Sequence, residues 1–227
     1  MRSRRTRRRT VRDEPADNDP PWYSAYLSPP VRALLDRPDG HYHLARPRRA
    51  QVCILFTDIR GYTELSRTID LEVLQQTVDA VAGQQSRLIA RHGGYLDYFA
   101  GDGAMAVFEG VGMTGRACRC ASAIIDVAAD AMAWPEQRPL PLGAGLHTGE
   151  VVLSSLGSEE RRIYTAIGET VNIAARLSDH AEPWSLLTTG SVLERLTPGY
   201  RRGFEAMPAA TPRGVGRGVG IYRLRSR

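Results

Sequence analysis

Two aspartates stand where expected strands give way to turns. Asp58 follows the apolar run Val52–Phe56, and Asp102 lies in the tight turn Ala100–Gly103. Carboxylate oxygens are the hard ligands that Mg²⁺ and Mn²⁺ prefer, and the small Gly61 behind Asp58 leaves backbone N–H groups open to phosphate. Each aspartate alone is more typical of a turn or cap residue, whereas the pair suggests a metal site that also binds phosphate.

These turns need a sheet that brings them together. Apolar runs bounded by turn residues predict strands, and apolar residues at helical spacing predict helices. Strands are expected at 52–56, 95–99, 104–108, 140–147, 150–155, 185–188 and 219–224, and helices at 71–91, 115–133 and 171–178. This order is typical of an α+β, ferredoxin-like sandwich with a mixed, mostly antiparallel sheet and helices packed on it. In that fold the first strand neighbours the hairpin at 95–108, so the turns that hold the aspartates should meet.

The length of the chain and the position of its charges predict one folded domain with a basic N-terminal extension. The 227 residues, 42% of them hydrophobic, can bury one core. We expect residues 1–21 to be a disordered Arg-rich tail, 22–49 an irregular N-terminal arm, and 50–227 the folded domain. Seven arginines before residue 13 exceed the formal net charge of +5, which leaves about −2 for the rest. The folded part is therefore not basic, and nucleic acid is not an expected partner.

Other features indicate a cytoplasmic location. The three cysteines, Cys53, Cys118 and Cys120, are odd in number and lack the spacing of a zinc site. This usage fits a reducing cytosol better than a disulfide framework. No run of about 18 apolar residues occurs, so neither a signal peptide nor a membrane span is expected.

Four blocks of sequence, in order, resemble the catalytic domain of class III adenylate and guanylate cyclases. The blocks are VCILFTDIRGYTE at 52–64, GDGAMAVF at 101–108, GLHTGEV at 145–151 and IGETVNIAARL at 167–177. The resemblance covers about residues 50 to 224. It implies an enzyme that converts a nucleoside triphosphate to a 3′,5′-cyclic nucleotide and pyrophosphate. It also implies two Mg²⁺ or Mn²⁺ ions in each active site.

The resemblance assigns roles to individual residues. Asp58, Asp102 and the backbone of Ile59 match the positions that bind the two metal ions. Asn172 matches a residue that orients the ribose, and Arg176 matches one that meets the charge developing at the α-phosphate. These two lie four residues apart, on one face of the expected helix.

The resemblance also implies a homodimer, and a basic residue near the C-terminal end that contacts phosphate. Cyclase sites of this class lie between two protomers, with the metal aspartates from one and the Asn/Arg pair from the other. Because this chain holds both sets, we expect a homodimer with two sites. Arg213 resembles a late basic residue that contacts the terminal phosphates.

The base pocket departs from the purine-cyclase pattern. Its positions match Phe56, Tyr98, Ala100, Thr165 and Ile167. Purine cyclases have Lys where this chain has Tyr98, and Asp or Thr where it has Thr165. Tyrosine removes an ammonium and adds bulk, which favours a smaller base. The pattern is similar to the uridylate and cytidylate cyclases of bacterial anti-phage (Pycsar) systems.

The sequence therefore favours UTP as substrate, with cyclic UMP as a second messenger for a downstream cyclic-nucleotide-responsive effector in anti-phage defence. The alternatives are an adenylate cyclase, which Thr165 would fit, and a catalytically weak nucleotide-binding regulatory domain. A diguanylate cyclase is disfavoured because no GG(D/E)EF block occurs. A further departure is Gly143, where many relatives have an arginine that steadies the phosphates.

Overall fold

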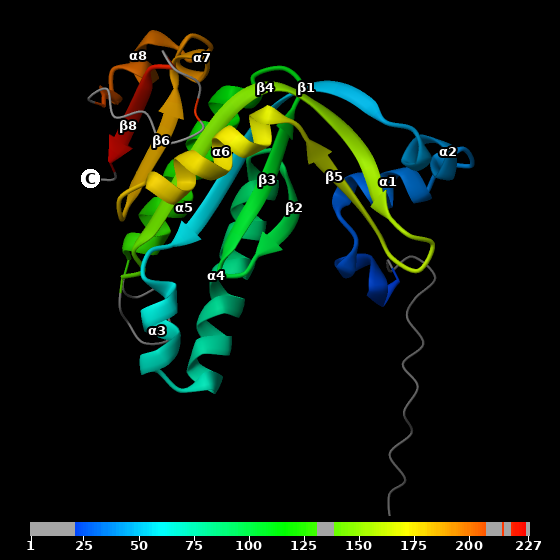
Figure 1. Ribbon diagram of the computed structural model, residues 1–227, viewed down its shortest axis with the longest axis horizontal. Helices are drawn as coiled ribbons and strands as arrows, with labels where there is room; N and C mark the ends of the chain where they lie inside the picture. Colours follow the sequence, from blue (N-terminus) through cyan, green and yellow to red (C-terminus); the bar gives the residue numbers. More distant parts are fainter. Residues whose placement is uncertain (1–20, 131–138, 208–214, 216–218, 226–227) are drawn as a thin grey trace, which may run out of the picture.

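A mixed sheet of eight strands forms the centre of the fold (Figure 1). Its order is β2-β3-β1-β4-β6-β8-β7, with β5 beside β4. The strands are β1 Arg48–Ile59, β2 Tyr95–Ala100, β3 Gly103–Glu109, β4 Leu142–Gly157, β5 Arg162–Ile167, β6 Ser185–Thr189, β7 Glu205–Ala206 and β8 Ile221–Arg225. Among the described pairings only β4 with β6 is parallel. The predicted α+β sandwich with a mostly antiparallel sheet is confirmed.

In this computed structural model the described residues are 21–130, 139–207, 215 and 219–225. The helices that follow the first strand are α3 Tyr62–Thr68, α4 Leu71–Arg91, α5 Met113–Ala129, α6 Glu169–His180, α7 Gly190–Leu193 and α8 Pro198–Arg201. On one side of the sheet α4 contacts strands β2 and β3 and α5 contacts β1, β3 and β4, whereas α6 packs along β4 and β1 (Figure 1). Within the described ranges no helix is long and apolar enough to cross a bilayer.

Alternate residues of β1 enter two separate cores, as the two-residue period of a strand requires. Leu55 belongs to the core under α4 and α5, whereas Ile54 belongs to the core that includes Ala174 of α6. All three cysteines are free and buried. Burial raises the pKa of the Cys53 thiol well above its usual range. It also raises the pKa of Cys118 and of Cys120 to about 12.

Strand β4 corrects the prediction of two strands at 140–147 and 150–155. It is continuous, and Gly149 pairs with Val52 in the ladder with β1. Gly145 and Gly149 are places where α6 lies against this strand. A Cβ on Gly145 would come within 2.1 Å of the Ser178 backbone nitrogen. Helix α3 and strand β5 were not predicted at all.

The arm at 22–49 is helical rather than irregular. It contains the 3₁₀ helix η1 Trp22–Tyr26 and the helices α1 Pro29–Leu35 and α2 Gly40–Ala45. Prolines occupy the first turn of α1, where their missing N–H is not needed. The arm then leads directly into β1, which begins at Arg48. The predicted tail lies outside the described residues, except for Pro21.

Candidate active site

The structure places Asp58 and Asp102 side by side at the ends of neighbouring strands. The Ile59 backbone N–H donates a hydrogen bond to Oδ2 of Asp102 at 3.0 Å. Two glycines make this approach possible. Gly101 has a φ of +67°, and a Cβ on Gly103 would lie 2.1 Å from the Thr57 carbonyl oxygen. Only glycine lets the hairpin tip lie this close to β1.

The carboxylate of Asp58 has an unusual electrostatic environment. Burial, together with a hydrogen bond to Asp102, raises the pKa of Asp58 to about 6. The guanidinium of Arg60 opposes this shift by contacting the Asp58 carboxylate. Two carboxylates this close favour a proton or a further cation between them.

This arrangement fits a divalent cation. Asp58 and Asp102 line a hollow of about 220 Å³ together with Ile59, Arg60, Gly61, Tyr62 and Thr63. Among the described residues, no three His, Cys, Asp or Glu side chains lie close enough together to hold a metal ion, at this site or at any other. Further ligands would therefore be water, backbone or substrate oxygens, which is the usual case for Mg²⁺.

Binding of Mn²⁺ should weaken as the pH falls below about 6, because a proton on Asp58 then competes with the ion. The apparent affinity should fall by up to about tenfold per pH unit, the limit for one competing proton. Calorimetric titration of the protein with Mn²⁺ at pH 5, 6, 7 and 8 measures the apparent affinity. Asp58→Asn should bind weakly at every pH. Equal affinity of the unsubstituted protein at pH 5 and pH 7 would contradict the assignment of Asp58.

Arg60 is a site residue that reasoning from sequence missed. It also donates a hydrogen bond to the Asp179 carbonyl oxygen at 3.0 Å. It lies against Gly143, where a Cβ would be 3.0 Å from Cβ of Ala181 and 3.3 Å from Nε of Arg60. The arginine that the resemblance expects at position 143 would crowd Ala181 and Arg60. Arg60, the residue that directly follows β1, supplies a positive charge beside Asp58 of the same strand.

Helix α6 carries Asn172 and Arg176 on one exposed face. Its last turn lies nearest the aspartates, because Asp179 accepts the hydrogen bond from Arg60. Asn172 lies two turns earlier, about 10 Å away along the helix axis. One chain thus gathers the aspartates, while Asn172 lies about two helical turns from the residue of α6 that contacts Arg60.

Comparison with known proteins identifies the chain. Residues 44–214 match the family described as the adenylate and guanylate cyclase catalytic domain. The chain belongs to this family.

Relatives of this cyclase domain include Adenylate cyclase 1 of Rhizobium meliloti (strain 1021), which is 30% identical over 197 residues. That match covers 82% of this chain and 29% of the relative. The adenylate cyclase of Anabaena cylindrica is 31% identical, and the match covers 65% of this chain and 31% of the relative. The chain therefore spans only about three tenths of the length of these relatives.

Solved structures give the same fold for the cyclase domain. The adenylyl cyclase CyaB from P. aeruginosa superposes with a TM-score of 0.71 at 26% identity, over 80% of this chain and 97% of that one. The guanylyl cyclase Cya2 superposes with a TM-score of 0.68 at 25% identity, over 80% of this chain and 94% of that one.

The residues expected at the base pocket of the cyclase domain fall into two groups. Thr165 is buried on β5, whereas Tyr98 on β2 and Ile167 at the end of β5 are each 41% exposed. Phe56 is buried within the core beneath α6, and Ala100 is the last residue of β2. Arg213 lies outside the described residues. The structure also adds Asp97, which accepts a hydrogen bond from Thr165.

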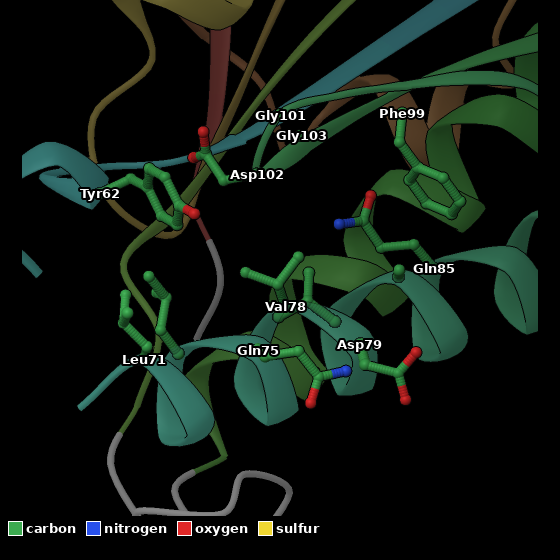
Figure 2. Close-up of a pocket in the computed structure, with 13 residues that line it drawn as sticks. Tyr62, Leu71, Gln75, Val78, Asp79, Gln85, Phe99, Gly101, Asp102 and Gly103 are labelled. Carbon is green, nitrogen blue, oxygen red and sulfur yellow. The ribbon is translucent and has the colours of Figure 1, made fainter. Parts of the chain in front are cut away.

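A second hollow adjoins the hairpin tip (Figure 2). It has a volume of about 500 Å³ and lies between α4 and the β2–β3 turn. Figure 2 shows Tyr62 from α3 beside Asp102 at one end, and Gln85 near Phe99 at the other. Gln85 is buried and accepts a hydrogen bond from the Thr57 hydroxyl at 2.5 Å. This bond ties α4 to the strand that carries Asp58.

Proposed function

We propose that this domain converts a nucleoside triphosphate to its 3′,5′-cyclic monophosphate and pyrophosphate. The observation that carries the proposal is the pair Asp58 and Asp102, held together by the hydrogen bond to Ile59 at strand ends of a cyclase fold. The test is incubation of the purified protein with each of the four ribonucleoside triphosphates and Mn²⁺, followed by chromatography of the products. Binding without product for all four would instead favour a catalytically weak regulatory domain.

The proposed mechanism relies on positioning and charge. Asp58, Asp102 and the Ile59 carbonyl would hold two Mg²⁺ or Mn²⁺ ions. Such ions lower the pKa of the ribose 3′-hydroxyl and balance the charge of the phosphates. In line with the family, Asn172 orients the ribose for attack on the α-phosphorus. Arg176 donates hydrogen bonds to the oxygens on which negative charge grows as pyrophosphate leaves.

We propose that the active unit is a homodimer with two composite sites. Asn172 lies two turns of α6 away from the end that adjoins the aspartates of its own chain. A second chain, related by a twofold axis, would bring its Asn172 and Arg176 to these aspartates, and both sites would form in the same way.

We propose UTP as the substrate, because Tyr98 stands at the expected base pocket with a half-exposed ring. The ring narrows the pocket and offers a stacking face but no ammonium. A second candidate, ATP, is favoured by the relatives named adenylate cyclase and by Thr165.

Tyr98→Lys and Tyr98→Ala should each raise the ratio of cyclic purine to cyclic pyrimidine product. One lost or gained base contact is worth about 1–3 kcal/mol, so the shift should be about 10- to 100-fold. Competition assays with equimolar UTP and ATP measure this ratio. The matched control is Tyr23→Ala, an exposed tyrosine of the arm. A wild-type protein that prefers ATP to UTP would refute the choice of UTP and leave the cyclase proposal intact.

The proposed setting is bacterial anti-phage defence in the cytoplasm, where cyclic UMP would act on a downstream effector that responds to cyclic nucleotides. Support comes from the tyrosine at position 98, which resembles the pyrimidine cyclases of such systems. Mass spectrometry of cell extracts before and after phage infection tests this role. A rise in cyclic UMP that requires Asp102 is the expected result.

A further inference from the structure

Asp97 interrupts the regular pairing of β2 with β3. Leu96 pairs with Ala106 and Tyr98 pairs with Met105, so Asp97 is an extra residue between consecutive partners. An extra residue of this kind is a β-bulge, which redirects side chains relative to an unbroken strand. Counting along the sequence in steps of two therefore does not predict where the Asp97 side chain points.

The redirected carboxylate meets β5. Thr165 Oγ1 donates a hydrogen bond to Oδ2 of Asp97 at 2.5 Å, although β2 and β5 lie far apart in the order of the sheet. Thr165 is 7% exposed. Asp97 also accepts a backbone hydrogen bond from Ala166, and burial raises the pKa of its carboxyl group. A carboxylate has about four acceptor positions, so it can accept further hydrogen bonds.

Resting on the proposed function, we infer that Asp97, held in place by Thr165, reads the hydrogen-bonding edge of the base, and that Tyr98 limits the size of the base. An ionised carboxylate only accepts hydrogen bonds, so its partner on the base must be a donor. Uracil presents an N3–H donor beside the O4 acceptor. Asp97 would accept from N3–H, while Thr165, whose one hydroxyl proton is donated to Asp97, would hold the carboxylate in place. Cytosine has a lone pair at N3, which would face the carboxylate without a proton.

The decisive variant is Asp97→Asn, which keeps the size of the side chain and adds an N–H donor. We expect its ratio of UTP to CTP turnover, as kcat/KM, to fall by about 10- to 100-fold, the effect of one mismatched hydrogen bond. Thr165→Val should weaken the preference, and Thr165→Ser should restore it. The matched control is Glu159→Gln, an exposed carboxylate in the turn between β4 and β5.

An equal loss of turnover with UTP and CTP would mean that Asp97 only fastens β2 to β5, and would overturn the inference. A wild-type preference for CTP over UTP would do the same. Calorimetric binding of UTP and CTP in the presence of Ca²⁺ gives a second reading of the ratio. If the wild type forms no product from any nucleotide, the cyclase proposal fails. The change in binding ratio between wild type and Asp97→Asn then decides the role of Asp97 by itself.

Discussion

Alanine at Asp58 or at Asp102 should reduce turnover by at least about 1,000-fold, because each would remove a ligand from the charge-stabilising site. The two side chains lie in one hollow, and neither can take over the position of the other. Initial rates of pyrophosphate release at saturating Mn²⁺ measure the effect. Product formation near the wild-type rate by either variant would contradict the metal assignment.

The thermal stability of asparagine variants at these two positions shows whether a loss of activity reflects a lost ligand or unfolding of the protein. Because the pKa of Asp58 is raised to about 6 in the folded state, its contribution to stability falls as the pH rises from 3.8 through 6. At pH 7 the ionised carboxylate is therefore unfavourable to folding, and Asp58→Asn should melt no lower than the wild type. Asp102→Asn retains an oxygen that can accept the Ile59 hydrogen bond. Glu159→Gln is again the matched control and should keep full activity.

Mixing Asp102→Ala protein with Arg176→Ala protein should restore activity that neither has alone. In a heterodimer, one composite site would receive both aspartates from one chain and an intact Asn/Arg pair from the other. Random exchange makes half of the dimers mixed, each with one intact site of two. About one quarter of the wild-type rate is therefore expected for twofold-symmetric subunits.

A second mixture provides the control. Asp58→Ala with Asp102→Ala should stay inactive, because each site of the heterodimer would lack one of the two aspartates. Subunits must first exchange, which labelled chains and native mass spectrometry can verify. Restoration in both mixtures, or in neither after verified exchange, would refute the composite site.

The sequence predicted those parts of the fold whose residues show a clear helical period or a clear turn signal. Helix α4 extends over the predicted 71–91, and the hairpin lies where Gly101 and Gly103 bracket Asp102. It failed where tertiary contacts override local signals. A glycine in a strand suggests a break, yet in β4 it makes room for α6. The short helices of the arm have too few turns for a clear period.

The site was only partly predictable for the same reason. In this fold the first strand lies beside the hairpin, so the sequence predicted that Asp58 and Asp102 lie close together. A bulge shifts the register by one residue, and only the paired strands show it, so Asp97 remained unnoticed. Arg60 belongs to no expected ligand pattern, and only the structure shows that it lies beside Asp58 and Gly143. The small residue at position 143 was the signal that could have suggested it.

The buried cysteines alter what the odd cysteine count means. Oxidation proceeds through the thiolate, and a thiol whose pKa is about 12 is almost wholly protonated at neutral pH. Cys53, Cys118 and Cys120 are also shielded from dissolved oxidants by the core around them. The folded domain should therefore tolerate peroxide and need no reductant during purification. Its cysteines are equally compatible with reducing and oxidising surroundings.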